Sequence, residues 1–213
     1  MAQDFEEVSR HIYTRFAEKL SPNLTYHSLY HTRNDVVPAA CRLARANDVS
    51  AEGCLLLKTA ALFHDTGFMQ VYSGHETYSI EIARQTLPDY GYSADQVTAI
   101  TELIAATRMP QRPCGLLQEI ICDADLDLLG RDDYMYLNGQ LWREVRHYAG
   151  QPIPEKEWRI EQLEFLRKHR FFTAAARTLR DAGDGVQVQR GADGLAHPHV
   201  LQFVAEVVEH QGA

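Results

Sequence analysis

The sequence predicts an all-α protein, and two observations support this prediction. Apolar residues recur at three- and four-residue spacing along most of the chain, among residues that favour helices. Before residue 185, no segment alternates apolar and polar residues as a half-buried strand does. The 213 residues correspond to one domain with an appendage, and a chain of this length can bury a core without disulfides.

Each predicted helix has a recognisable beginning or end. The helical segments are residues 4–20, 27–47, 50–64, 76–87, 94–107, 116–129, 132–148 and 154–180. Pro38 predicts a kink or a break in the second segment, and Ser50 is placed to cap the third. The third is apolar on nearly every face, as expected at the centre of a core, and Gly67 predicts its end. Pro88 ends the fourth segment, and residues 93–96 form a capping box for the fifth.

The C-terminal segment differs in composition from the rest of the chain. Four glycines between residues 181 and 194 predict a flexible or hairpin-like connector. An amphipathic helix is then predicted by apolar residues at helical spacing, which are Val200, Phe203, Val204, Val207 and Val208. Its apolar face needs cover from the main body or from a second copy, so a homo-oligomer through this helix is one expectation. We therefore expect a domain over residues 1–180 and an appendage over residues 181–213.

Charge and cysteine content limit the classes of partner. The chain has 21 basic and 29 acidic residues, a net charge of −8, so general nucleic-acid binding is disfavoured. The four cysteines show no Cys-x-x-Cys spacing and the first ten residues contain no apolar signal segment. We therefore expect a cytoplasmic protein with reduced thiols. The densest apolar stretch, residues 54–63, is too short to span a membrane, so no membrane association is expected.

Histidines and aspartates in three places form a candidate metal-binding set. His27 and His31 are four residues apart, so on a helix they share a face. His64 and Asp65 end the apolar third helix, and three aspartates occupy alternate positions of residues 123–127 in a later apolar segment. Imidazole and carboxylate together suit a divalent ion such as Mn²⁺, Fe²⁺, Zn²⁺ or Mg²⁺. Each feature alone has a simpler explanation, since a His-x-x-x-His pair is often a surface accident and the aspartates could face solvent.

The order of these residues resembles the motif of the HD superfamily of metal-dependent phosphohydrolases. That motif reads His, His-Asp and Asp, here His31, His64, Asp65 and Asp125. The matching blocks are residues 26–32, 62–68 and 122–126, and the similarity covers about residues 22–130 and, more loosely, the helices to residue 180. The resemblance implies an HD-domain helical bundle with one or two metal ions at its centre, followed here by a C-terminal helical appendage. It also implies that Asp125, rather than a neighbouring aspartate, is the ligand.

The block around His27 is similar to that of cyclic-nucleotide phosphodiesterases. This resemblance implies that His27 is the general acid and His31 a metal ligand, while the alternative is that His27 has no catalytic role. Imidazole suits proton donation because it titrates near neutral pH. The HD resemblance gives Asp65 two tasks, which are to bind the metal and to orient the attacking water.

Several positions depart from the family patterns. Phe68 stands where the phosphodiesterases have a further histidine and where hydrolases of guanosine tetraphosphate begin an acidic pair, which disfavours both specific activities. His75 is a candidate for a second metal or for substrate, although it could simply begin a helix. Thr107 stands where two-metal relatives often have a histidine, which disfavours a complete second metal site.

Basic side chains near these blocks are candidates for binding phosphate. They are Lys58, Arg108 and Arg112, and their simpler interpretation is as ordinary solvated residues. The expected activity is hydrolysis of a phosphate mono- or diester, on a small substrate such as a nucleotide or cyclic nucleotide. The metal would polarise phosphoryl oxygens and activate water. The alternative is a non-catalytic HD module that senses a ligand or binds a partner around a structural metal.

Overall fold

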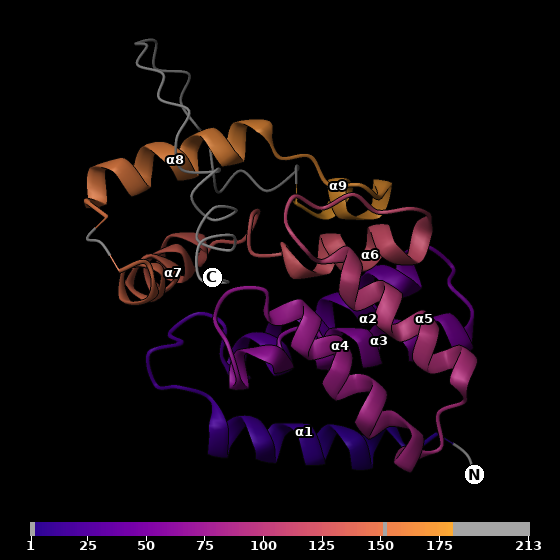
Figure 1. Cartoon of the computed structure of the whole chain (residues 1–213). Coiled ribbons are helices and arrows are strands. Elements are labelled where there is room, and N and C mark those ends of the chain that lie inside the picture. The colour runs from indigo at the N-terminus through magenta and orange to yellow at the C-terminus, as the bar shows by residue number, and fades with distance from the viewer. Residues whose placement is uncertain (1–2, 151–152, 181–213) are drawn as a thin grey trace.

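A computed structural model describes residues 3–150 and 153–180 (Figure 1). Over these residues the protein has nine α-helices and no strand, which confirms the predicted all-α class. The helices are α1 (Phe5–Lys19), α2 (Val37–Ala46), α3 (Ala51–Phe63), α4 (His75–Thr86), α5 (Ala94–Ala106), α6 (Leu116–Asp125), α7 (Tyr134–Tyr148), α8 (Glu155–Lys168) and α9 (Ala174–Arg180). Three shorter turns complete them, a π-helix η1 (His31–Val36) and two 3₁₀ helices, η2 (Thr66–Met69) and η3 (Leu87–Tyr90).

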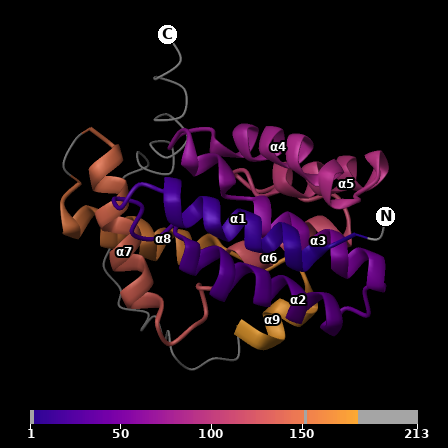
Figure 2. The same ribbon diagram turned by 90° about the horizontal axis from the view of Figure 1, so that it is seen from below.

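Helix α3 lies at the centre of the bundle. It packs against α1, α2, α4, α5 and α6, and Figure 2 shows α1 crossing in front of it. Leu57, Leu62 and Phe63 are fully buried in the core. A helix whose faces are nearly all apolar is stable only when other helices surround it, and this explains its place. The end of α3 is therefore held deep inside the protein, and this is where His64 and Asp65 follow.

Most of the predicted helix ends agree closely with the structure. Ser50 caps α3 by accepting a hydrogen bond from the Gly53 N–H at 3.1 Å. Ser93 and Gln96 form both hydrogen bonds of the capping box at the start of α5. The break expected at Pro38 is a change of helix type, because the π-helix η1 passes directly into α2 one residue before this proline. The proline thus occupies the first turn of α2, where a missing N–H is tolerated.

Gly67 has a different role from the one expected. It does not form a left-handed helix stop; it lies in η2, and a Cβ built on it would stand 1.9 Å from the carbonyl oxygen of His75. Its N–H donates to the Ser79 hydroxyl at 2.8 Å. Glycine is required here because η2 and the start of α4 approach too closely for any side chain. This close approach brings His75 beside Asp65.

The prediction of one helix over residues 154–180 is wrong, because the chain divides into α8 and α9. The carboxylate of Asp123 accepts hydrogen bonds from the N–H groups of Phe172 and Thr173 and from the Thr173 hydroxyl, all at 2.7–2.8 Å. These bonds fix the first turn of α9 on α6. The predicted segment 116–129 is also shorter than expected, since α6 ends at Asp125.

Helices α7 and α8 lie together at one end of the molecule in both views, while α9 returns to pack on α2 (Figures 1 and 2). No helix among the described residues is long and apolar enough to cross a bilayer. The predicted connector and amphipathic helix, residues 181–213, lie outside the described residues.

Candidate metal centre

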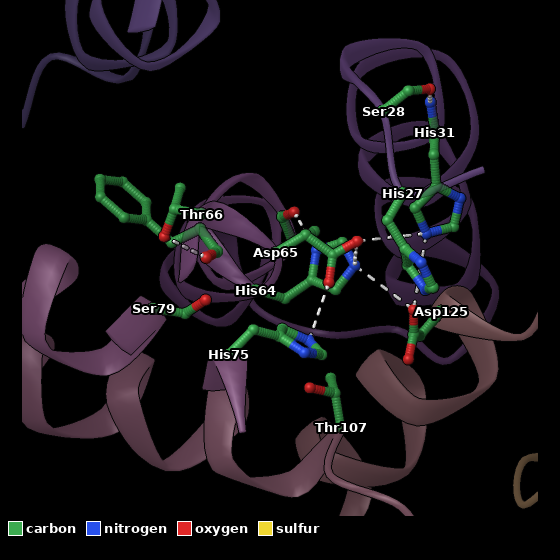
Figure 3. A network of polar contacts seen from close by, with 12 residues as sticks. His27, Ser28, His31, His64, Asp65, Thr66, His75, Ser79, Thr107 and Asp125 are labelled. Carbon is green, nitrogen blue, oxygen red and sulfur yellow. Dashed lines mark hydrogen bonds and ion pairs between the residues drawn. The ribbon is translucent and has the colours of Figure 1, made fainter. Parts of the chain in front are cut away.

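Four side chains from three parts of the chain converge in the core (Figure 3). His31 begins η1, His64 and Asp65 directly follow α3, and Asp125 is the last residue of α6. His31, His64 and Asp65 are at most 4% exposed. Because η1, α3 and α6 pack on one another, their ends meet at a single point. The tertiary structure thus brings together all four residues of the HD-like motif.

The atoms that face one another are all potential metal ligands. His64 Nε2 lies 3.1 Å from Asp65 Oδ2 and 3.3 Å from Asp125 Oδ1, and His31 Nε2 lies 3.6 and 3.8 Å from the same two oxygens. Within the described residues, His31 Nε2, His64 Nε2 and Asp65 Oδ2 are buried without a hydrogen-bond partner. Orphaned buried polar atoms are costly unless something binds them. His31, His64 and Asp65 form a buried group that could hold a metal ion.

The tautomer of His64 suits metal binding. Its Nδ1 lies 2.8 Å from the carbonyl oxygen of Ala61. A carbonyl oxygen only accepts, so Nδ1 carries the proton and Nε2 faces the two carboxylates. Ligating histidines commonly have their second nitrogen fixed by a backbone carbonyl in this way.

Opposite charges at the centre stabilise one another. Burial favours neutral side chains, but Asp65 and Asp125 hold the pKa of His64 well above its ordinary value. Burial alone would raise the pKa of each carboxyl; instead His64 and His75 hold the pKa of Asp65 well below its usual range. His31 and His64 likewise lower the pKa of Asp125 to about 2. The carboxylates are therefore ionised at neutral pH, and a bound cation would displace a proton from His64.

His75 lies beside this group, on the far side of Asp65. Its Nε2 is 3.3 Å from Asp65 Oδ1, and its Nδ1 is 3.9 Å from Glu76 Oε2. Asp65 thus presents one oxygen to the cluster and the other to His75 (Figure 3). Thr107 stands at the edge of the same view, but its hydroxyl donates to the carbonyl oxygen of Ile104 at 2.8 Å. The structure places His75 beside Asp65, and it is also the first residue of α4.

His27 is held by a residue that the sequence analysis did not identify. Glu144, on α7, is fully buried and contacts His27 Nδ1 with its side-chain oxygen. Its other oxygen accepts hydrogen bonds from the N–H groups of Tyr26 and His27 at 2.8 and 3.0 Å. Burial lowers the pKa of His27, but the charge and hydrogen bond of Glu144, with the charges of Asp65 and Asp125, together outweigh burial and raise that pKa to about 9. No spacing signal marks Glu144, because its partner lies 117 residues away.

Phe68 packs against both His27 and His75. Its ring stacks on His75 with centroids 3.8 Å apart and on His27 with centroids 4.5 Å apart. The ring is buried, and the centroids of the two imidazoles lie 6.3 Å from each other. The position that the phosphodiesterases give to a histidine is therefore a packing position in this chain.

The three basic candidates for phosphate binding differ in location. Lys58 is not brought to the cluster; its ammonium lies over the ring of Phe5, 4.1 Å from the centroid. Arg108 lies nearer, since its guanidinium is 4.0 Å from Glu76 Oε2 and donates to the Thr77 hydroxyl at 3.0 Å. Arg112 is exposed on the loop before α6. In the same loop, Gln111 donates to Asp125 Oδ2 at 3.5 Å, a contact that the sequence analysis also missed.

A cavity of about 330 Å³ borders His31 on the side of α7. Its lining includes Tyr26, Tyr30 and Tyr136 together with Asp35 and Asp133, and it contains no lysine or arginine. Both aspartates pair with Arg131, so this lining suits a neutral ring or hydroxyl groups.

The site thus contains nitrogen and oxygen atoms that can bind a cation, and His27, whose raised pKa keeps it protonated at neutral pH. This combination can polarise an electrophile and protonate a leaving group. In comparisons with protein-family models, with curated proteins and with solved structures, nothing matches this chain.

Proposed function

We propose that this protein is a metal-dependent phosphohydrolase of the HD type that acts on a small phosphorylated substrate. The observation that carries the proposal is the buried group of orphaned atoms, His31 Nε2, His64 Nε2 and Asp65 Oδ2. Together with Asp125 they would hold one divalent ion, and their nitrogen and oxygen donors suit Mn²⁺, Fe²⁺ or Zn²⁺, with Mg²⁺ less favoured by two imidazoles. Such an ion supplies Lewis acidity toward phosphoryl oxygens and acidifies water.

His27 supplies the proton in this proposal. Glu144 binds its Nδ1, so the Nε2 proton is the one available for transfer to the leaving oxygen. A pKa raised to about 9 keeps His27 protonated at neutral pH, as a general acid requires. Glu144 is a positioning residue, because it acts through His27 rather than on the substrate.

Asp65 and His75 would together orient the attacking water. Asp65 Oδ1 points away from the cluster toward His75 Nε2, 3.3 Å away. An imidazole and a carboxylate oxygen at this separation form a pair that can accept and hold a proton from water. Arg108, whose guanidinium lies 4.0 Å from Glu76 Oε2 near the start of α4, is the candidate to bind the phosphate.

The substrate class that fits best is a nucleotide or another phosphate ester with a ring. The cavity beside His31 has an aromatic lining, and its two aspartates pair with Arg131, so it would hold the part of the substrate that is not phosphate. The phosphate itself would lie at the His/Asp cluster.

The test is hydrolysis by the purified full-length chain. We expect Mn²⁺-dependent turnover of bis-p-nitrophenyl phosphate or of members of a nucleotide panel, and loss of turnover with a chelator. Asp65→Asn should abolish the Mn²⁺-dependent turnover. Asp89→Asn makes the same substitution at an exposed aspartate and should leave turnover unchanged. A chain that binds metal stoichiometrically but hydrolyses nothing would instead be a non-catalytic ligand sensor or partner-binding module.

A further inference from the structure

The three aspartates of residues 123–127 face two different sides of the protein. Asp125 points to the histidines of the candidate metal centre, while Asp123 and Asp127 are buried against α9 and α2. Residues two apart on a helix do not share a face, which separates Asp123 from Asp125, and the turn after α6 brings Asp127 to the side of α9 and α2. We propose that α9 is a positioning element for the metal centre, and that Thr173 and Arg180 fix Asp125 by holding Asp123 and Asp127.

The first attachment is at the start of α9. Asp123 is 1% exposed, and its carboxylate accepts three hydrogen bonds, from the Phe172 N–H, the Thr173 N–H and the Thr173 hydroxyl. The Thr173 hydroxyl in turn accepts from the Ala176 N–H at 3.1 Å. Without residues 172 and 173, a buried carboxylate on α6 would lose every hydrogen-bond donor that the described residues give it.

The second attachment is at the end of α9. Arg180 binds both oxygens of Asp127, with Nε at 2.9 Å from Oδ1 and Nη2 at 2.5 Å from Oδ2. Arg42 of α2 approaches the same two oxygens at 3.0 and 2.9 Å. The Arg180 backbone also packs so closely on Gly130 that a Cβ there would stand 2.8 Å from the Arg180 carbonyl oxygen. The turn after α6 is thus held on both sides.

These two attachments lie two residues before and two residues after Asp125, at Asp123 and Asp127. The Asp127 N–H bonds to the carbonyl oxygen of Ala124, so the turn after α6 is continuous with the helix. A displacement of Asp123 or Asp127 would therefore move the Asp125 backbone, while His31 and His64 stay on η1 and α3. Metal affinity depends on ligand position, and outer-shell changes commonly cost 10- to 100-fold.

The experiment measures Mn²⁺ affinity of the full-length chain by calorimetric titration. The variant is Thr173→Val with Arg180→Gln, compared at a temperature where circular dichroism shows native helical content. We expect the dissociation constant for Mn²⁺ to rise at least about tenfold. Thr173→Ser alone keeps the hydroxyl and should bind Mn²⁺ like the wild type. The control, Ser93→Ala with Arg159→Gln, removes the cap of α5 and an ion pair within α8, neither of which involves a residue of α6, and should also leave affinity unchanged.

Unchanged Mn²⁺ affinity in the folded double variant would overturn the proposal and leave α9 a purely stabilising role. An equal loss in the control would overturn it too, because the effect would then be general destabilisation. If the double variant does not fold, Thr173→Val alone is measured against the same criteria. The readout does not use turnover, so a chain that binds Mn²⁺ without hydrolysing anything refutes the proposed activity and not the role of α9.

Discussion

Glu144 and His27 form one unit although 117 residues separate them. The Glu144 carboxylate is fully buried, contacts His27 Nδ1 and binds the backbone N–H of the same residue. A buried carboxylate is stable when several donors satisfy it, and Tyr26 and His27 provide them. This pair therefore fixes the segment before η1 on α7, and it fixes the ring that would donate a proton.

The Glu144–His27 pair predicts a dependence of stability on pH. Burial opposes both charges, but the charge and hydrogen bonds of the partner, together with smaller contributions from nearby groups, outweigh it. The pKa of His27 rises from 6.5 to about 9 and that of Glu144 falls below 4.5. The stabilisation is thus complete between about pH 4.5 and 6.5. The stabilisation of the folded state declines by up to about 3 kcal/mol as pH rises toward 9 and His27 loses its proton. It also declines below about pH 4.5, as Glu144 takes up a proton. We expect the unfolding free-energy difference between the metal-free wild type and His27→Gln with Glu144→Gln to follow this course in urea titrations. A difference that is constant from pH 5 to 9 would contradict the pairing.

Asp65 contributes one oxygen to the candidate metal centre and the other to His75. Asp65→Asn should remove bound Mn²⁺ from the purified protein, because an amide oxygen carries no charge to balance the cation. Helical content should persist, since the core is built from residues on other helices. Metal analysis with circular dichroism checks both expectations. Gross unfolding would mean that Asp65 has a structural role, and retained Mn²⁺ would remove it from the ligands.

His27 and His31 predict opposite phenotypes. His31→Ala should lose metal and all turnover, because His31 Nε2 faces the two carboxylates. His27→Ala should keep metal but lose about 10²–10⁴-fold on substrates with poor leaving groups. A p-nitrophenyl ester needs little protonation and should lose far less. Metal content and rates on both substrate types distinguish the two residues, and equal metal loss in both would make His27 a ligand.

Substitution of Gly67 should disturb the packing between η2 and the start of α4. In Gly67→Ala the new Cβ would collide with the His75 carbonyl oxygen, so η2 or α4 must shift. We expect a loss of about 1–3 kcal/mol in the free energy of unfolding, as for other overpacked sites. Gly139→Ala is the control, because a Cβ there meets nothing within 4 Å, and it should stabilise α7 by up to about 1 kcal/mol. Urea unfolding measures both, and a neutral Gly67→Ala would contradict the close approach.

Glu161 on α8 predicts a second pH effect, far from the metal centre. Burial, with the charges of Glu157 and Glu164, raises the pKa of Glu161 from 4.5 to about 7. The folded state therefore takes up a proton that the unfolded state does not, and stability falls as pH rises from about 4.5 to 7. Glu161→Gln removes this penalty, so its melting temperature should exceed that of the wild type at pH 8. At pH 4 the two should coincide; equal melting temperatures at both values would show that Glu161 is not perturbed.

The sequence alone was sufficient for the all-α class and for most helix ends, because these depend on local signals. Apolar spacing, the Ser50 cap and the Ser93–Gln96 capping box act within a few residues, and the structure contains each of them. The apolar third helix also predicted its own central place. Local signals failed over residues 154–180, where the helix break depends on Asp123, which lies 49 residues before Phe172.

The residues of the candidate metal centre were likewise predictable only in part. His31, His64, Asp65 and Asp125 were recognisable from their order and residue types, but only the packing of η1, α3 and α6 brings their atoms within 4 Å. Glu144 was not recognisable as a site residue, since a buried glutamate has no distinctive spacing. Lys58 was misplaced because its direction depends on Phe5 in another helix. The physical reason is common to these cases: a side chain acquires its role from neighbours that are distant in sequence, and only tertiary packing determines which neighbours those are.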